Sequence, residues 1–250
     1  MIGISRYTRI LALFDQAQPE WTVAEMSKTL ETSASTLYRL VREMVEAGML
    51  EATVESRYRL GAFFIEYYRR IRLNDPLVRS GAKFLEPMIQ QSTLPCTVIL
   101  ARLYGNTVMC VAESRAPSAK FETSYELGRP MPILRGATSK AVLSTMMPRI
   151  ARNFLQKEVN IAPNDLVALE KELSTIRKNG ICETHGEVDS TLVGIAAPVR
   201  NDQLGIHASL SLITESHLLT DDLRPSVFTS LSATAKLIER FMADTLLEAN

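Results

Sequence analysis

The apolar positions of the first fifty residues recur at helical spacing and predict three short amphipathic helices. The first helix is expected over residues 5–17 and ends before Pro19, since proline disfavours helical backbone in the residue that precedes it. Its apolar face, at positions i, i+3, i+4 and i+7, consists of Ile10, Leu13, Phe14 and Ala17.

The second helix carries its own start signal. Thr22 and Glu25 have the spacing of a capping box, in which two side chains satisfy unpaired backbone N–H groups. Trp21 and Met26 flank this start at the positions of a hydrophobic staple. We therefore expect a helix that begins at Thr22, and its buried face consists of Val23, Met26 and Leu30.

The third helix separates its apolar residues from its polar ones. Ser33 is a preferred N-cap residue, and Gly48 follows the helix as a C-terminal glycine often does. The predicted buried face consists of Leu37, Leu40, Val41 and Met44. The exposed face consists of Ser35, Thr36, Tyr38, Arg39 and Arg42. Because no acidic residue occurs from Ser33 to Arg42, this face suits contacts with phosphate and, through arginine, with guanine.

Two short strands are expected after Gly48, with a turn near residues 55–56. A helix–turn–helix of this kind places its second helix in the DNA major groove, and the strand pair would form a wing beside it. We predict that residues 1–60 are a winged helix-turn-helix DNA-binding domain. The candidate DNA-contacting residues are Thr22, Ser33, Ser35, Thr36, Tyr38, Arg39, Arg42, Arg57 and Arg59.

Residues 61–75 are apolar and aromatic on one side and basic on the other, which predicts a linker helix. Asp75-Pro76 is a helix-start signal, so a further helix is expected to about Gln91 and the domain boundary near residues 73–76. The connection has no Gly/Ser-rich segment, and we expect it to be stiff. Periodicity leaves open whether the aromatic residues of the linker pack within their own domain or form a dimer contact.

Residues 76–250 are predicted to form one α+β domain for effector binding and oligomerisation. Strands are expected over residues 96–103, 107–114, 119–126, 181–187, 193–200 and 204–214. Helices are expected over residues 137–145, 148–157 and 163–179, followed by a long C-terminal helix capped by Thr220 or Asp221. This order of elements indicates a mixed sheet flanked by helices.

Composition narrows the classes of function. The chain is 46% hydrophobic and 22% charged with zero net charge, which is typical of a soluble globular protein with no membrane span. Residues 57–72 hold five arginines against one acid, so positive charge is concentrated locally. The three cysteines form no CxxC pair, and Arg6 and Arg9 interrupt the apolar N-terminus. We therefore predict a cytoplasmic protein without a structural disulfide framework or a signal peptide.

The motifs together resemble those of the IclR family of bacterial transcription regulators. In the first domain the resemblance is carried by residues 21–25, 35–40, 48–51 and 58–61, and in the second by residues 135–143 and 193–199. It covers nearly the whole chain in the same order. The resemblance implies a GAF-like C-terminal domain that binds a small metabolite, and assembly as a homodimer or a dimer of dimers on a double-stranded operator.

The loop before residue 137 is the expected effector site. Gly136 allows close backbone approach, the N–H groups at a helix N-terminus attract a carboxylate, and Thr138 and Ser139 add hydroxyls. The resemblance places effector contacts at Ala137, Thr138, Thr184, Leu192, Gly194, Ser209 and Ser211. We expect a small organic acid as effector, control of a catabolic operon, and no cofactor.

Four positions depart from the common family pattern. Ser139, Gly194 and Thr184 replace a glycine, a cysteine and an acid, which leaves the identity of the effector open. Ala34 replaces a lysine before the recognition helix and removes one possible phosphate contact.

Two alternatives to a DNA-binding regulator remain open from the sequence. Cys182, His185 and Glu187 bring a thiol, an imidazole and a carboxylate together, as in a zinc sensor or a Cys–His enzyme. On an extended strand, however, Cys182 and His185 point to opposite faces, and we expect neither a metal site nor an enzyme. A winged helix can also bind protein or RNA instead of duplex DNA.

Overall fold

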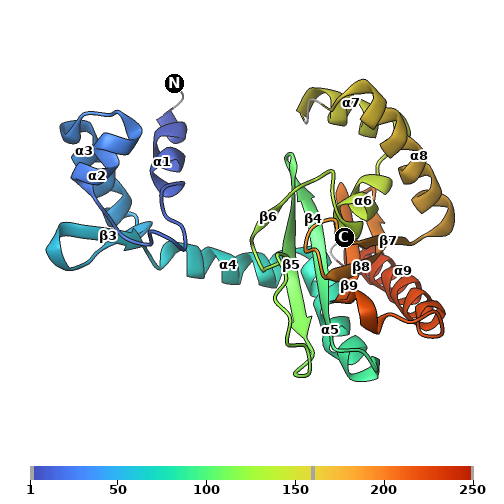
Figure 1. Cartoon of the computed structure of the whole chain (residues 1–250). Helices are drawn as coiled ribbons and strands as arrows, with labels where there is room; N and C mark the ends of the chain where they lie inside the picture. The colour runs from blue at the N-terminus through green and yellow to red at the C-terminus, as the bar shows by residue number, and fades with distance from the viewer. Residues whose placement is uncertain (1–2, 159–160, 249–250) are drawn as a thin grey trace. The chain divides into compact units, whose positions relative to one another are not determined.

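The computed structural model describes residues 3–158 and 161–248, and the chain divides into two compact units, residues 1–74 and 75–250 (Figure 1). Both units combine helices with antiparallel strands, so the α+β class is confirmed. Among the described residues, no helix is long and apolar enough to cross a membrane.

Helix α1 is shorter than the sequence predicts. It spans Gly3–Leu11 and does not extend to residue 17. The chain leaves the helix because Trp21 holds the next segment in a loop, with its indole N–H donating to the Leu13 carbonyl oxygen at 2.9 Å. Ile10 is buried as predicted, whereas Ala17 is exposed.

Helices α2 (Val23–Leu30) and α3 (Ala34–Glu46) form the predicted helix–turn–helix. The capping box is confirmed: Thr22 Oγ1 accepts the Glu25 N–H at 3.2 Å, and the Glu25 carboxylate accepts the Thr22 N–H at 2.7 Å. The buried core of this unit consists of Ile10, Trp21, Val23, Met26, Leu37, Leu40, Val41, Met44 and Leu50.

The wing is also present. Its strands are β1 (Trp21–Thr22), β2 (Leu50–Ala52) and β3 (Arg57–Leu60), with the short 3-10 helix η1 (Val54–Ser56) between the last two. They form an antiparallel sheet in the order β1-β3-β2. Glu55 and Ser56 have φ values of 57° and 56°, so the chain reverses at the predicted position.

Two glycines join the end of α3 to the end of the wing. A Cβ atom on Gly61 would lie 2.2 Å from the Gly48 carbonyl oxygen, so only glycine fits at this crossing. The Gly61 N–H donates to Met49 at 2.9 Å, and the Phe63 N–H donates to Gly48 at 3.1 Å. The linker helix α4 (Phe63–Asn74) begins directly after this contact.

The second unit is built on a sheet with the strand order β6-β5-β4-β9-β8-β7 within the described residues. Its strands are β4 (Cys96–Tyr104), β5 (Thr107–Arg115), β6 (Pro130–Met131), β7 (Cys182–His185), β8 (Leu192–Asn201) and β9 (Ile206–Glu215). Neighbouring strands are antiparallel, which corrects the predicted mixed sheet, because β4–β5 and β8–β9 are hairpins and β9 returns antiparallel to β4. A parallel bridge joins Cys110 to Leu127.

The strand predicted over residues 119–126 is wrong, because this segment is a loop. Side chains hold its backbone in place of a strand ladder. Arg115 donates to the Ala119 carbonyl oxygen at 3.3 Å, and Asp189 accepts the Ser124 N–H at 2.9 Å. Pairing with β5 resumes at the parallel bridge of Leu127 and continues, antiparallel, at β6.

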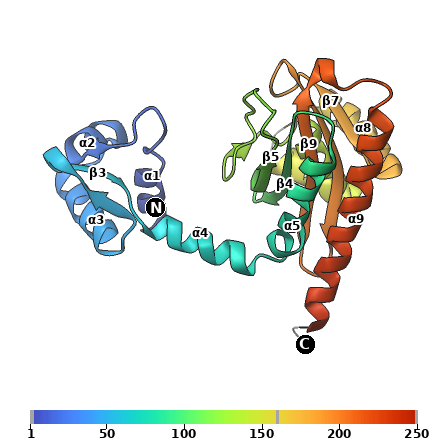
Figure 2. The same cartoon turned by 90° about the horizontal axis from the view of Figure 1, so that it is seen from below.

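Helices cover both faces of the sheet (Figure 2). One face carries α5 (Pro76–Gln91) and α9 (Arg224–Glu248), and the other carries α6 (Ala137–Ser144), with α8 (Pro163–Asn179) and α7 (Pro148–Glu158) outside it. Helix α9 begins later than predicted because the Thr220 carbonyl oxygen accepts the N–H groups of Leu223 and Arg224 in a turn.

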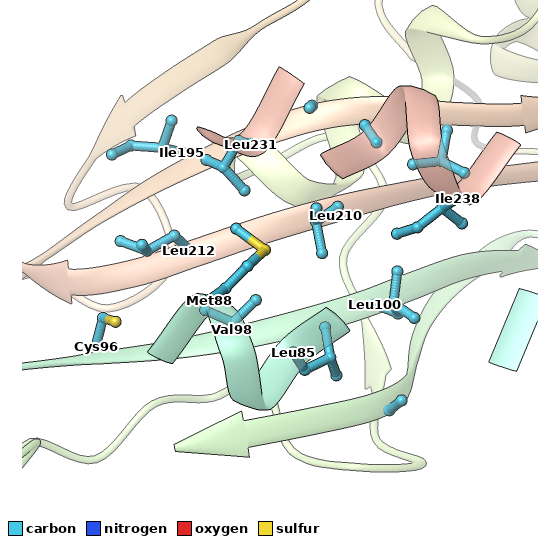
Figure 3. Packing of buried hydrophobic residues seen from close by; sticks show 14 of the residues in the cluster. Leu85, Met88, Cys96, Val98, Leu100, Ile195, Leu210, Leu212, Leu231 and Ile238 are labelled. Carbon is cyan, nitrogen blue, oxygen red and sulfur yellow. The ribbon is translucent and has the colours of Figure 1, made fainter. Parts of the chain in front are cut away.

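The larger core lies between the sheet and helices α5 and α9 (Figure 3). Alternate strand residues point to this side, so the side chains between them face α6. The members of this core that Figure 3 labels are Leu85, Met88, Cys96, Val98, Leu100, Ile195, Leu210, Leu212, Leu231 and Ile238.

Candidate DNA-binding surface and effector cavity

The N-terminal half of α3 presents a hydroxyl-rich face. Ser33 occupies the N-cap position, but its side chain makes no capping bond to the helix backbone. Its hydroxyl lies instead 2.9 Å from that of Thr36 and 3.3 Å from that of Ser35. Tyr38 lies on the exposed side of the helix and is 60% exposed.

The two arginines of α3 pair with acids of their own helix. Arg39 lies 2.9 Å from Glu43, and Arg42 lies 3.8 Å from Glu46. Both arginines and Glu46 are exposed, whereas Glu43 is half-buried and also accepts a hydrogen bond from Tyr7 of α1. Exposed ion pairs of this kind contribute little to stability, so both guanidinium groups are free to reorient toward another anion.

Thr22 and the wing arginines also have partners within the unit. The Thr22 hydroxyl belongs to the capping box, and Arg57 lies 3.2 Å from Glu25 of α2. Arg59 lies 2.9 Å from Glu51 across the wing strands. The hydrogen bonds with Thr22, followed by Arg57, hold the pKa of Glu25 below its usual value, so this carboxylate remains charged.

Two further arginines border the recognition helix, and the sequence analysis did not select them. Arg6 and Arg9 of α1 line a hollow of about 280 Å³ together with Thr32 and Thr36. Arg9 donates to the Leu30 carbonyl oxygen at 3.2 Å. Their signal in the sequence is two arginines three positions apart on the polar side of an acid-free helix, residues 3–11.

A small cavity lies at the N-terminus of α6, between this helix and the sheet. Its volume is about 20 Å³, which holds roughly one water molecule. The predicted effector residues that line it are Gly136, Ala137, Thr138, Thr184, Leu192 and Gly194. The lining residues that sequence reasoning missed are Tyr125, Glu187, Val188, Asp189 and Ile213.

The three predicted serines lie beside this cavity or away from it. Ser211 is fully buried and accepts a hydrogen bond from the Thr138 hydroxyl at 3.0 Å, one layer behind the lining. Ser209 is also fully buried, 3.5 Å from Ser211. Ser139 donates to the Pro132 carbonyl oxygen at 2.8 Å, outside the cavity lining.

The N–H groups at the start of α6 already have acceptors. The Gly136 N–H donates to the Glu187 carboxylate at 2.9 Å, and the Ala137 N–H donates to the Thr184 hydroxyl at 2.9 Å. Lys140, one turn further along α6, donates to Glu187 at 2.7 Å and to Glu172 at 2.8 Å. The N-terminus of α6, a position that favours anions, is therefore occupied by the Glu187 carboxylate of the same unit.

Glu187 and Lys140 stabilise each other's charged form. Burial raises the pKa of Glu187, but the hydrogen bonds from Lys140 and the Gly136 N–H outweigh it, so the pKa lies below its usual value. Burial likewise lowers the pKa of Lys140, and the two carboxylates more than reverse this effect. Both groups are consequently ionised near neutral pH.

The residues proposed for a zinc or Cys–His site do not meet. Cys182 is buried, and burial raises the pKa of its thiol to about 12. His185 is exposed and lies 2.6 Å from Glu183, whereas Glu187 turns back into the cavity after Gly186, which has a φ of 63°. Among the described residues, no group of three or more His, Cys, Asp or Glu side chains is arranged to hold a metal ion.

A winged helix with an exposed polar helix, together with a second unit that holds a cavity at a helix N-terminus, defines a ligand-responsive transcription regulator. The family model for the IclR helix-turn-helix domain matches residues 3–53. The model for the C-terminal domain of bacterial transcriptional regulators of the IclR type matches residues 74–240. The chain belongs to the IclR family of transcriptional regulators.

Individual relatives are distant but match along most of their length. The HTH-type transcriptional regulator KipR of Bacillus subtilis is 22% identical over 89% of this chain and 90% of its own. XynR of Escherichia coli is 24% identical over 88% of each chain. The fold is similar to that of an IclR homologue from Microbacterium hydrocarbonoxydans complexed with 4-hydroxybenzoate, with a TM-score of 0.78, 22% identity and coverage of 96% and 99% of the two chains. KipR and XynR are both HTH-type transcriptional regulators.

Proposed function

We propose that this regulator binds a palindromic duplex operator as a homodimer or a dimer of dimers, with α3 in the major groove. The observation that carries the proposal is the exposed face of α3, where Arg39 and Arg42 are themselves exposed and pair with Glu43 and Glu46 of their own helix. Ser35 and Tyr38 lie on the same exposed side. Arginine forks can pair with guanine edges there, and we expect Arg59 and the α1 arginines to contact the adjoining phosphates.

Self-association is supported by the linker helix α4. Its described side chains include none that is buried within the unit. Large apolar side chains at the i, i+4, i+7 spacing of one helix face are among the exposed ones, with Phe64 at 36%, Tyr68 at 37% and Ile71 at 53%. An exposed apolar helix face of this size is typical of a protein–protein contact, and a second copy of α4 supplies a matching surface.

The cavity at the N-terminus of α6 is the proposed effector site, and a small organic acid is the proposed effector. The support is chemical: backbone N–H groups at a helix start favour an anion, and Lys140 is a buried cation beside them. The protomers are expected to adopt one arrangement that fits the operator and another that does not. The effector must bind one of these arrangements more tightly, because a ligand with equal affinity for both does not change their populations. We propose that the protein binds its effector and its operator in the cytoplasm, and that the operator controls a catabolic operon.

Selection of duplex fragments from the source genome by the purified protein tests the proposal. The expected result is enrichment of a palindromic site that competes strongly against random duplex DNA and single-stranded RNA at moderate salt. Equal capture of unrelated duplexes, or preference for single-stranded RNA, would contradict it. Repeating the selection with a metabolite pool tests whether an effector changes the enrichment.

A further inference from the structure

The effector cavity as it stands has no room for an effector. Its volume of about 20 Å³ is far below the roughly 300–1,000 Å³ typical of ligand pockets. Any small molecule that enters must therefore displace something that lines the cavity now. This inference rests on the proposed function only in taking the cavity as the effector site.

Glu187 belongs to the part of the lining that has a path to solvent. The residues from α6 and from the central strands belong to packed elements, and the Tyr125 side chain is only 5% exposed. The Glu187 side chain, in contrast, is 32% exposed and lies in the connection between β7 and β8, just after Gly186. Rotation of its side chain outward would open the cavity without unpacking the core.

The contacts of Glu187 are those that a bound carboxylate would make. One oxygen accepts the Gly136 N–H at 2.9 Å, and the other accepts from Lys140 at 2.7 Å. Lys140 cannot follow Glu187 outward, because its side chain is only 9% exposed. If Glu187 left, a buried ammonium group and an N–H group would both lose an acceptor at the same point, which is costly.

A second observation points independently to a ligand in this cavity. The Tyr125 hydroxyl is buried in the lining and makes no well-formed hydrogen bond among the described residues, although the hydroxyls of Thr138 and Ser139 lie near it. It stands 2.6 Å from the position that a Cβ atom on residue 136 would take. A ligand at the start of α6 would therefore find an unused hydroxyl beside it.

We propose that Glu187 occupies the carboxylate site of the effector, and that a small monocarboxylate binds by exchanging with it at the Gly136 N–H and Lys140. In this exchange the ligand carboxylate takes the two contacts and Glu187 turns into solvent. No covalent bond changes.

Charge explains why exchange is favoured over simple addition. Lys140 already pairs with Glu172 and Glu187, and Asp189 also lines the cavity. A further carboxylate added beside these would be desolvated next to Lys140, a buried cation that already has two acceptors, which costs several kcal/mol. Exchange leaves the charge of the buried cluster unchanged.

Chemical rescue tests this proposal without operator DNA or effector. In Glu187→Ala, acetate should fill the vacated site, so about 50 mM sodium acetate should raise the thermal midpoint of the second unit by roughly 2–4 °C over equal sodium chloride or acetamide. In the wild type Glu187 competes, and the rise should stay below about 1 °C. The unfolding is followed by far-ultraviolet circular dichroism at neutral pH.

The matched control is Glu170→Ala, which removes a carboxylate from a pair with Arg152 away from the cavity, at 2.5 Å. Acetate should not raise its midpoint more than that of the wild type. A Glu187→Ala protein that folds only in acetate gives the same supporting result. The proposal is overturned if acetate has no specific effect on Glu187→Ala, if that variant stays unfolded in acetate, or if all three proteins respond equally. If acetate stabilises Glu187→Ala but no metabolite changes operator binding, the carboxylate site is supported and the proposed effector function is refuted.

Discussion

Replacing Gly136 with alanine should destabilise the second unit and leave the winged helix intact. Gly136 has φ 82° and ψ 150°, a region of backbone space that is essentially restricted to glycine and costs another residue about 1–3 kcal/mol. The added Cβ would also lie 2.6 Å from the Tyr125 hydroxyl and 2.8 Å from a methyl group of Val188. Moving these neighbours apart costs a further 1–3 kcal/mol, approximately, as in other overpacked sites.

The expected loss is therefore about 2–6 kcal/mol in the free energy of unfolding, or roughly 5–20 °C in the thermal midpoint of this unit. Two optical signals separate the units. The single tryptophan of the chain is Trp21, so its fluorescence reports on the winged helix, while far-ultraviolet circular dichroism reports on both units.

Gly180→Ala is the control, because Gly180 also has a positive φ, 69°, but nothing lies within 4 Å of the added Cβ. It should cost only about 1–2 kcal/mol, the conformational cost alone. If Gly136→Ala loses no more stability than Gly180→Ala, the crowding at the start of α6 is not as described and the reasoning fails.

Three other outcomes follow from particular contacts. Arg6→Ala should lower the slope of log affinity against log salt for the operator by about 1, if Arg6 contacts one phosphate beside α3; an unchanged slope would remove α1 from the DNA surface. Ser211→Ala should lower the free energy of unfolding, measured in urea, by about 1–3 kcal/mol, because it leaves the buried Thr138 hydroxyl without its acceptor. Adding Thr138→Val to this variant should recover part of the loss. Fully additive losses in the double variant would show that the two hydroxyls do not interact. The pKa of Glu187 is lowered in the folded protein, so its stabilising contribution is present above its ordinary value of 4.5 and is lost as pH falls through the folded pKa. The difference in unfolding free energy between wild type and Glu187→Gln should therefore narrow below about pH 4.5, and a constant or widening difference would contradict the assigned ion pair.

Local signals in the sequence predicted the winged helix well. The capping box depends on residues three positions apart, and the turn at Glu55 and Ser56 lies between two adjacent strands. Such features are decided by neighbours in the chain, so spacing alone identifies them. The early end of α1 was missed because it depends on Trp21, whose indole bonds to a carbonyl group eight residues earlier.

Long-range contacts explain what the sequence could not predict in the second unit. The segment 119–126 has strand-like composition, but Asp189, more than sixty residues away, accepts its backbone N–H at Ser124. Glu187 was considered only as a metal ligand beside His185, because nothing local shows that Gly186 reverses the chain toward α6. The resemblance indicated the loop before α6 and the strands facing it, whereas the contacts of Glu187 with Gly136 and Lys140 became visible only in the folded arrangement.

The most direct test of the account is the operator affinity of the double variant Arg39→Ala/Arg42→Ala. The account predicts at least a roughly 30-fold loss of affinity against wild type, since each good arginine contact with a base is worth about 1–3 kcal/mol. Arg149→Ala, an exposed arginine of the second unit, should bind the operator as the wild type does. Fluorescence anisotropy at one salt concentration, with circular dichroism to confirm folding, makes the comparison. A folded double variant with wild-type operator affinity would contradict the assignment of α3 as the recognition helix.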